Sequence, residues 1–193
     1  MRQRILFYSL LTGLFVTRLA WAQAGLPPEW ETRKQLAALV TTANRLQPVL
    51  GELNPEAWKE NGAPAAYVQQ WQNTRKAVGY LQTSAERLAR DPNRLTLAMD
   101  TYFRLQGMEQ LLNSLAAGVR RYQNPAVADL LMGIANENSA NRDFLEQYMK
   151  DLAAAHESEL HVMDTEAQRC RSILSKQPPP AKKPAAAAKG AKD

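Results

Sequence analysis

The fold of this 193-residue chain is decided by its longest uninterrupted helical pattern, residues 125–175, which read PAVADLLMGIANENSANRDFLEQYMKDLAAAHESELHVMDTEAQRCRSILS. Beyond Pro125 the stretch has no proline and one glycine, Gly133, so it can form a helix of about 50 residues, or roughly 75 Å. An apolar seam with alternating spacings of three and four residues predicts coiled-coil character. The seam consists of Leu131, Ile134, Asn138, Asn141, Leu145, Met149, Leu152, His156, Leu160, Met163, Ala167, Cys170 and Leu174.

Three shorter helical patterns precede this stretch. The first begins near Pro28 and contains Pro48, which lacks a backbone donor and predicts a kink or an early end. The second spans about residues 65–90, and the third about 92–122. Short capping pairs separate the patterns and predict antiparallel neighbours. The pairs are Asn54-Pro55, Asp91-Pro92 and Asn124-Pro125. We therefore predict an all-α fold: an up-and-down helical bundle of about four helices with a very long last helix and a disordered C-terminal tail.

The N-terminus has the three zones of a cleavable signal peptide, over residues 1–22. Two arginines come first, residues 5–16 are almost entirely apolar, and small residues follow. The apolar run is shorter than the roughly 20 residues that cross a bilayer. We expect cleavage after Ala22, with Ala24 as a second possible site, and a mature protein that is periplasmic or secreted.

Loss of this leader changes the distribution of charge. The full chain carries a formal charge of +5, and three arginines lie in the leader, so the mature chain carries +2. The expected tail, residues 176–193, contains five lysines and one aspartate, which leaves the bundle domain, residues 23–175, slightly acidic. We expect no nucleic-acid binding. The tail is interpreted as a tether to anionic envelope polymers or lipid headgroups, or as a solvated low-complexity extension.

The two histidines, His156 and His161, lie in one run of the long pattern. His156 is followed three residues later by Glu159, and His161 by Asp164, so the two side chains of each pair could face a metal ion from one side of a helix. A separation of five residues, however, places the two rings about 140° apart around a helix. No Glu-x-x-His, haem-attachment, phosphate-loop or hydrolase motif occurs. We expect no enzyme and no cofactor, and metal-dependent chemistry at this run is a third hypothesis.

The distal end of the seam extends beyond the length that the shorter helices can cover. We hypothesise that it packs on the first helix or forms a homodimer. Cys170 lies on this part of the seam, and a parallel dimer in register would bring two copies together in an intermolecular disulfide. A buried thiol acting as a small apolar residue is the alternative. The remaining seam residues expected to meet a partner are Leu160, Met163, Ala167 and Leu174.

Two further features leave alternatives open. Asn138 and Asn141 form a polar step in the seam, which would specify helix pairing if buried and mark a bend if exposed. Aromatic residues could line a groove for a peptide, glycan or apolar ligand, or belong to the core. They are Trp30, Trp58, Trp71, Tyr67, Tyr80 and Tyr102. The sequence as a whole predicts a non-enzymatic exported protein with an interaction, scaffolding or chaperone-like role in the cell envelope. A bundle that binds a small apolar ligand or cofactor between its helices is the alternative.

Overall fold

The computed structural model describes residues 25–176, and over that range it contains helices and their connections only. The expected signal peptide and the expected tail beyond Lys176 lie outside the described residues. Within the range, no helix combines the length and the apolar character needed to cross a membrane. The predicted all-α class is confirmed. The elements are α1 (Glu29–Gly51), α2 (Pro55–Trp58), a 3-10 turn η1 (Lys59–Asn61), α3 (Ala66–Arg90), α4 (Leu95–Tyr122), α5 (Pro125–Glu137) and α6 (Ser139–Lys176).

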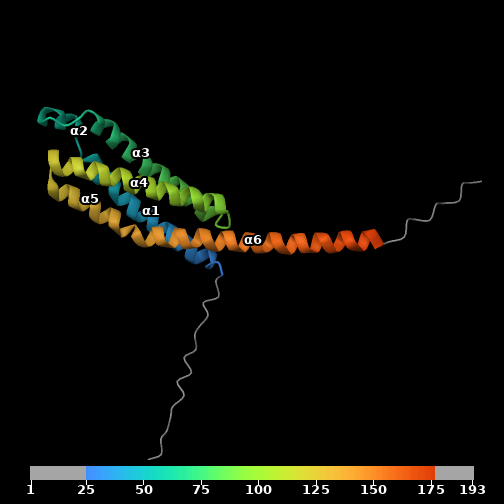
Figure 1. The fold of residues 1–193 in the computed structure, drawn as a ribbon. Coiled ribbons are helices and arrows are strands. Elements are labelled where there is room, and N and C mark those ends of the chain that lie inside the picture. The colour runs from blue at the N-terminus through green and yellow to red at the C-terminus, as the bar shows by residue number, and fades with distance from the viewer. Residues whose placement is uncertain (1–24, 177–193) are drawn as a thin grey trace, which may run out of the picture.

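The long helices alternate in direction, as an up-and-down bundle requires (Figure 1). α3 packs between α1 and α4, and α5 and α6 pack against α4 and close the bundle on α1. The connector formed by α2 and η1 lies at one end of the bundle. The turn between α3 and α4 lies at the other, and α6 leaves the bundle beside this turn.

Leucine side chains fill the interior at the spacings of three and four residues seen in the sequence. Burying one such side chain contributes about 1.5–3 kcal/mol, so the core is large enough to hold the helices together. The largest fully buried side chains are Leu36, Leu39, Leu46, Leu50, Leu81, Leu88, Leu105, Met108, Leu112, Leu115, Leu131 and Leu145. They come from every long helix, which makes the bundle a single core.

Two helix boundaries differ from those expected at prolines. α1 continues through Pro48 and ends only at Gly51, because a proline in the last turn removes a single intrahelical hydrogen bond. α4 begins at Leu95 and not at Pro92. The backbone around Pro92 instead forms a turn, and the carbonyl oxygen of Pro92 accepts a hydrogen bond of 2.8 Å from the Tyr148 hydroxyl. The Pro92 carbonyl is thus bonded to α6, and α4 begins after an extended residue, Arg94.

The long C-terminal pattern is interrupted at one residue, Asn138, between α5 and α6. The backbone nitrogen of Asn138 donates to the carbonyl of Ala135, three residues back, at 3.0 Å, which tightens the last turn of α5. Asn138 and Asn141 are 0% and 8% exposed, and the Asn141 amide donates to the Asn138 side-chain oxygen at 3.2 Å. The polar step is therefore buried and is also the place where the pattern breaks.

Candidate functional site

The last part of α6 projects beyond the bundle as a single helix (Figure 1). Every side chain of residues 157–176 is exposed, and we call this segment the arm. At 1.5 Å per residue the arm extends about 30 Å. The distal seam therefore does not pack on α1, and this half of the expectation is wrong. The reason is that α1 begins at Glu29 and α4 at Leu95, so neither helix reaches past the base of the arm.

The predicted partner seam lies along the arm and is exposed to solvent. Leu160, Met163 and Leu174 are 61%, 59% and 65% exposed. Ala167 and Cys170 complete the same line at spacings of three and four residues, and both are exposed. The alternative of a buried Cys170 is thus wrong for the single chain, whereas an intermolecular disulfide stays a prediction. Contiguous exposed apolar residues of this kind are typical of a binding surface.

Hydrogen bonds fix α6 to the bundle just before the arm begins. The buried Tyr148 hydroxyl donates to the Pro92 carbonyl oxygen, and burial raises the pKa of this phenol above its usual value. One turn before the arm's first apolar residue, His156 places its Nε2 atom 3.1 Å from the carbonyl oxygen of Asn93. The Asn93 side chain in turn donates to Glu29 at 3.4 Å. The α3–α4 turn and the start of α1 thus hold the base of the arm.

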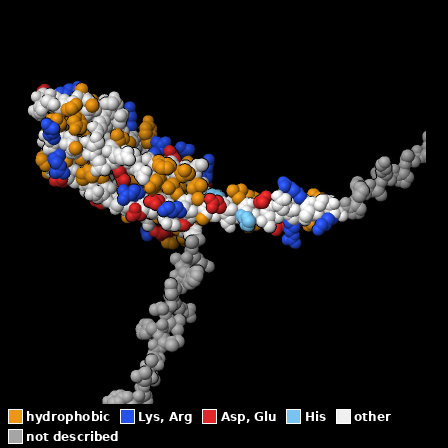
Figure 2. Space-filling view, viewed as in Figure 1, with side chains coloured by type: hydrophobic (Ala, Val, Ile, Leu, Met, Phe, Trp, Pro, Cys, Tyr) orange, Lys and Arg blue, Asp and Glu red, His pale blue; other side chains and the backbone are white. Residues whose placement is uncertain are grey.

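Charges are unequally distributed along the arm. Its first ten residues carry four carboxylates, and its last ten carry three cations and no acidic residue. Figure 2 shows red side chains closer to the bundle and blue ones toward the far end. The acidic residues are Glu157, Glu159, Asp164 and Glu166, and the basic residues are Arg169, Arg171 and Lys176. The arm therefore combines an apolar seam with an acidic half and a basic half.

Among the described residues, neither histidine belongs to a cluster of three metal-ligating side chains. His156 lies 3.5 Å from Glu159, while His161 lies on the exposed arm. Among residues 25–176 no three His, Cys, Asp or Glu side chains gather closely enough to bind an ion. The metal hypothesis therefore gains no support from the described residues.

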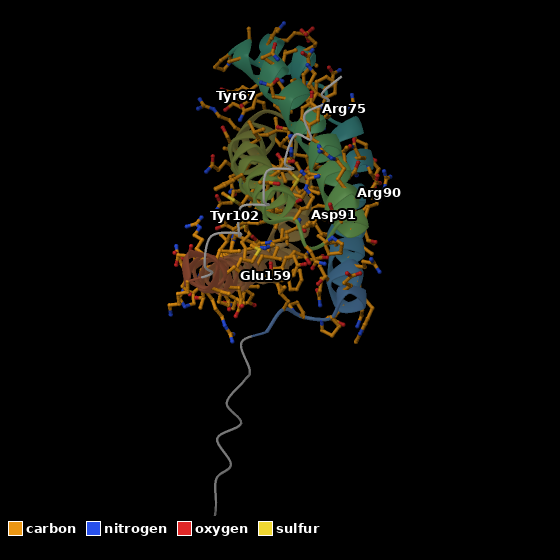
Figure 3. All side chains as sticks on the ribbon, turned by 90° about the vertical axis from the view of Figure 1, so that its right-hand side faces the viewer. Tyr67, Arg75, Arg90, Asp91, Tyr102 and Glu159 are labelled. Atoms are coloured by element: carbon orange, nitrogen blue, oxygen red, sulfur yellow. The ribbon has the colours of Figure 1, made fainter. Side chains whose placement is uncertain are left out.

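The aromatic residues do not line one common groove. Trp58 is buried and packs against Tyr67 and Tyr122 near the α2 end, with ring centroids 5.8 Å and 6.4 Å away. Trp30 is 65% exposed at the start of α1, near the opposite end of the bundle. Tyr67 and Tyr102 lie at separate levels of the bundle (Figure 3). Core packing is the better interpretation of the cluster around Trp58.

A polar pocket that the sequence did not predict lies where α4 meets the break between α5 and α6. It encloses about 120 Å³. Glu109 forms an ion pair of 3.2 Å with Arg142 there, and burial raises the pKa of Glu109 although the guanidinium opposes this shift. Ligand pockets usually enclose about 300–1,000 Å³, so this one is too small for a cofactor. Its remaining lining residues are Asn113, Met132, Ala135, Asn136 and Ser139.

Comparisons of the chain with models of protein families, with curated proteins and with solved structures found no match. The function of the protein is therefore inferred from the geometry of the arm.

Proposed function

We propose that this protein is an exported interaction or scaffolding protein of the cell envelope, and that the arm is the element that docks to a partner helix. The observation that carries the proposal is the exposed seam of Leu160, Met163 and Leu174 on a helix fixed to a folded bundle. A partner helix that buries one such side chain would gain about 1.5–3 kcal/mol of binding free energy.

The bundle stabilises the helical conformation of the arm before any partner binds. An isolated helix of about 20 residues is marginally stable in water because its first turn is costly to form. In α6 the first turns are already formed inside the bundle, where Leu145 and Leu152 are buried. The arm can therefore present its seam without much of the ordering cost that a disordered segment would incur on binding. This preorganisation favours an interaction role for the arm over a role as a passive extension.

Site-specific photocrosslinking in cells that produce the protein tests the arm. A photoreactive amino acid at Met163 is expected to form a covalent adduct, because this seam position would be covered by the partner. Thr165 is the matched control: it is on the arm, is exposed and bonds only to its own helix through a hydroxyl contact of 2.9 Å to His161. Equal or absent labelling at both positions would refute the docking role.

Export is proposed from the sequence pattern at the N-terminus, because a positive start, a short apolar run and small residues are typical of a cleavable leader. The test is the intact mass of protein recovered from the periplasmic or extracellular fraction of bacterial cells. We expect a chain that begins at Gln23. A full-length chain that stays in the cytoplasmic fraction would contradict the proposal without affecting the docking role of the arm.

A further inference from the structure

The chemistry of the arm restricts the kind of partner that can bind it. A partner helix must carry an apolar seam and a charge distribution that complements an acidic half followed by a basic half. The arm itself meets both requirements when it is reversed end for end, because its basic half then lies beside the acidic half of the other copy. We propose, resting on the docking role above, that the arm pairs with the arm of a second copy of this chain in antiparallel orientation.

Two charged residues beside the seam set the orientation. Asp164 and Arg171 each follow a seam residue directly, Met163 and Cys170, so both flank the seam on the same side. They are seven residues apart, and the midpoint between them is next to Ala167. An antiparallel pair with its two-fold axis near this point places Asp164 of each copy opposite Arg171 of the other. Symmetry forms this pair twice, and flanking ion pairs of this type choose orientation in coiled coils.

A parallel pair in register has the opposite electrostatics. Like halves of the arm lie side by side, so the two acidic halves, with four carboxylates each, adjoin one another. This orientation would also bring the two Cys170 thiols together. An antiparallel pair centred near Ala167 keeps the two thiols on different levels of the seam. The charge distribution therefore favours the antiparallel dimer over the parallel one that the cysteine alone suggested.

The shape of the molecule agrees with this pairing. The arm leaves the bundle as a straight projection of about 30 Å with no other described element beside it (Figure 1). Antiparallel overlap of two arms leaves one bundle at each end of a shared two-helix rod, so the two bundles stay apart. The small side chain of Ala167 at the centre lets the two backbones approach closely.

The experiment is size-exclusion chromatography with light scattering on the full purified chain under reducing conditions, together with small-angle X-ray scattering. We expect a concentration-dependent dimer that weakens as salt is added, because the pairing is between opposite charges. Its scattering profile should be that of two separated bundles. A chain that stays monomeric at every concentration would overturn the proposal. If Met163 then still crosslinks to another protein in cells, the docking role survives and only self-pairing fails.

Charge variants test the orientation. D164R and R171D should each weaken the dimer about tenfold, because each change replaces two attractive pairs with two repulsive ones. An equimolar mixture of the two variants should recover the dimer, since one copy then carries a cation at both positions and the other copy a carboxylate at both. R169D is the matched control: it makes the same charge change on the side of the arm away from the seam and should dimerise like the wild type. A dimer that D164R strengthens, or one linked through Cys170 without reductant, would be parallel and would overturn the antiparallel assignment.

Discussion

Adding a single methyl group at Gly118 should distinguish steric crowding from helix propensity in α4. A β-carbon built at Gly118 would lie 2.8 Å and 2.9 Å from the Cδ1 and Cζ atoms of the Tyr67 ring, and closer still to Cε1. The ring cannot move away freely, because Trp58 and Tyr122 pack against it, each at a centroid distance of 5.8 Å. The variant G118A therefore forces a rearrangement of the aromatic cluster between α2, α3 and α4.

Gly107 provides the control, because it lies in the same helix and a β-carbon there meets nothing within 4 Å. Replacing a helical glycine with alanine stabilises a protein by about 1 kcal/mol through propensity alone, so G107A should raise the free energy of unfolding by that amount. Overpacking costs about 1–3 kcal/mol, so G118A should lie between unchanged and about 2 kcal/mol less stable than the wild type. The difference between the two variants isolates the clash, at about 1–3 kcal/mol.

Urea unfolding followed by circular dichroism gives these free energies. The clash should disappear when Tyr67 is replaced by alanine, so G118A introduced into the Y67A variant should stabilise by about 1 kcal/mol, as G107A does. If G118A in the wild-type background is as stabilising as G107A, the close approach of α3 and α4 at this point is refuted. If G118A is still unfavourable in the Y67A background, the clash is real but the ring is not its cause.

Three further changes probe other parts of the molecule. Y148F removes the buried hydroxyl that donates to Pro92 at 2.8 Å and should lower the free energy of unfolding by about 1–3 kcal/mol, as measured by urea unfolding, because the carbonyl loses its partner. Burial raises the pKa of Glu109, so protonation of this residue favours the folded state. Its contribution to the free energy of unfolding is complete below the unfolded-state pKa of 4.5 and is lost as pH rises through the folded-state pKa. The free energy of unfolding of the wild type minus that of E109Q should therefore be larger at pH 4 than at pH 7. The same difference at both pH values would contradict this expectation. Deletion of residues 177–193 removes four lysines and should abolish salt-sensitive cosedimentation with anionic lipid vesicles. If the deletion variant binds the vesicles as well as the full chain does, the tail is not the lipid-binding segment.

Local patterns were enough to predict most helices. The second pattern, expected over residues 65–90, forms α3 from Ala66 to Arg90, because a regular apolar stripe requires no distant information. The caps at Asn54 and Asn124 are confirmed, and their side chains accept hydrogen bonds of 3.4 Å and 2.9 Å from the first turns of α2 and α5. Asp91 does not open α4 in the same way, because it ends α3, where its backbone nitrogen donates to the carbonyl of Arg87, and α4 begins only after Arg94.

The polar pocket shows what local patterns could not predict. Glu109 and Arg142 are 33 residues apart in sequence, and their ion pair depends on how α4 lies against α6. Neither residue belongs to a motif, and the only available signal was a polar step near Asn138 that left burial and bending as alternatives. The structure combines the two. Asn138 is buried at the break and its side-chain oxygen accepts a hydrogen bond from Asn141, while its side-chain nitrogen has no partner among the described residues.

Spacing along one helix is a local property, so the sequence predicts that the last seam continues to Leu174. The place where that seam changes from core to surface depends on how the helices pack. The boundary lies near His156, because the turn at Asn93 and the start of α1 at Glu29 end the bundle at this level. The same apolar spacing is therefore buried at Leu152 and exposed at Leu160, and the difference comes entirely from the lengths of the neighbouring helices.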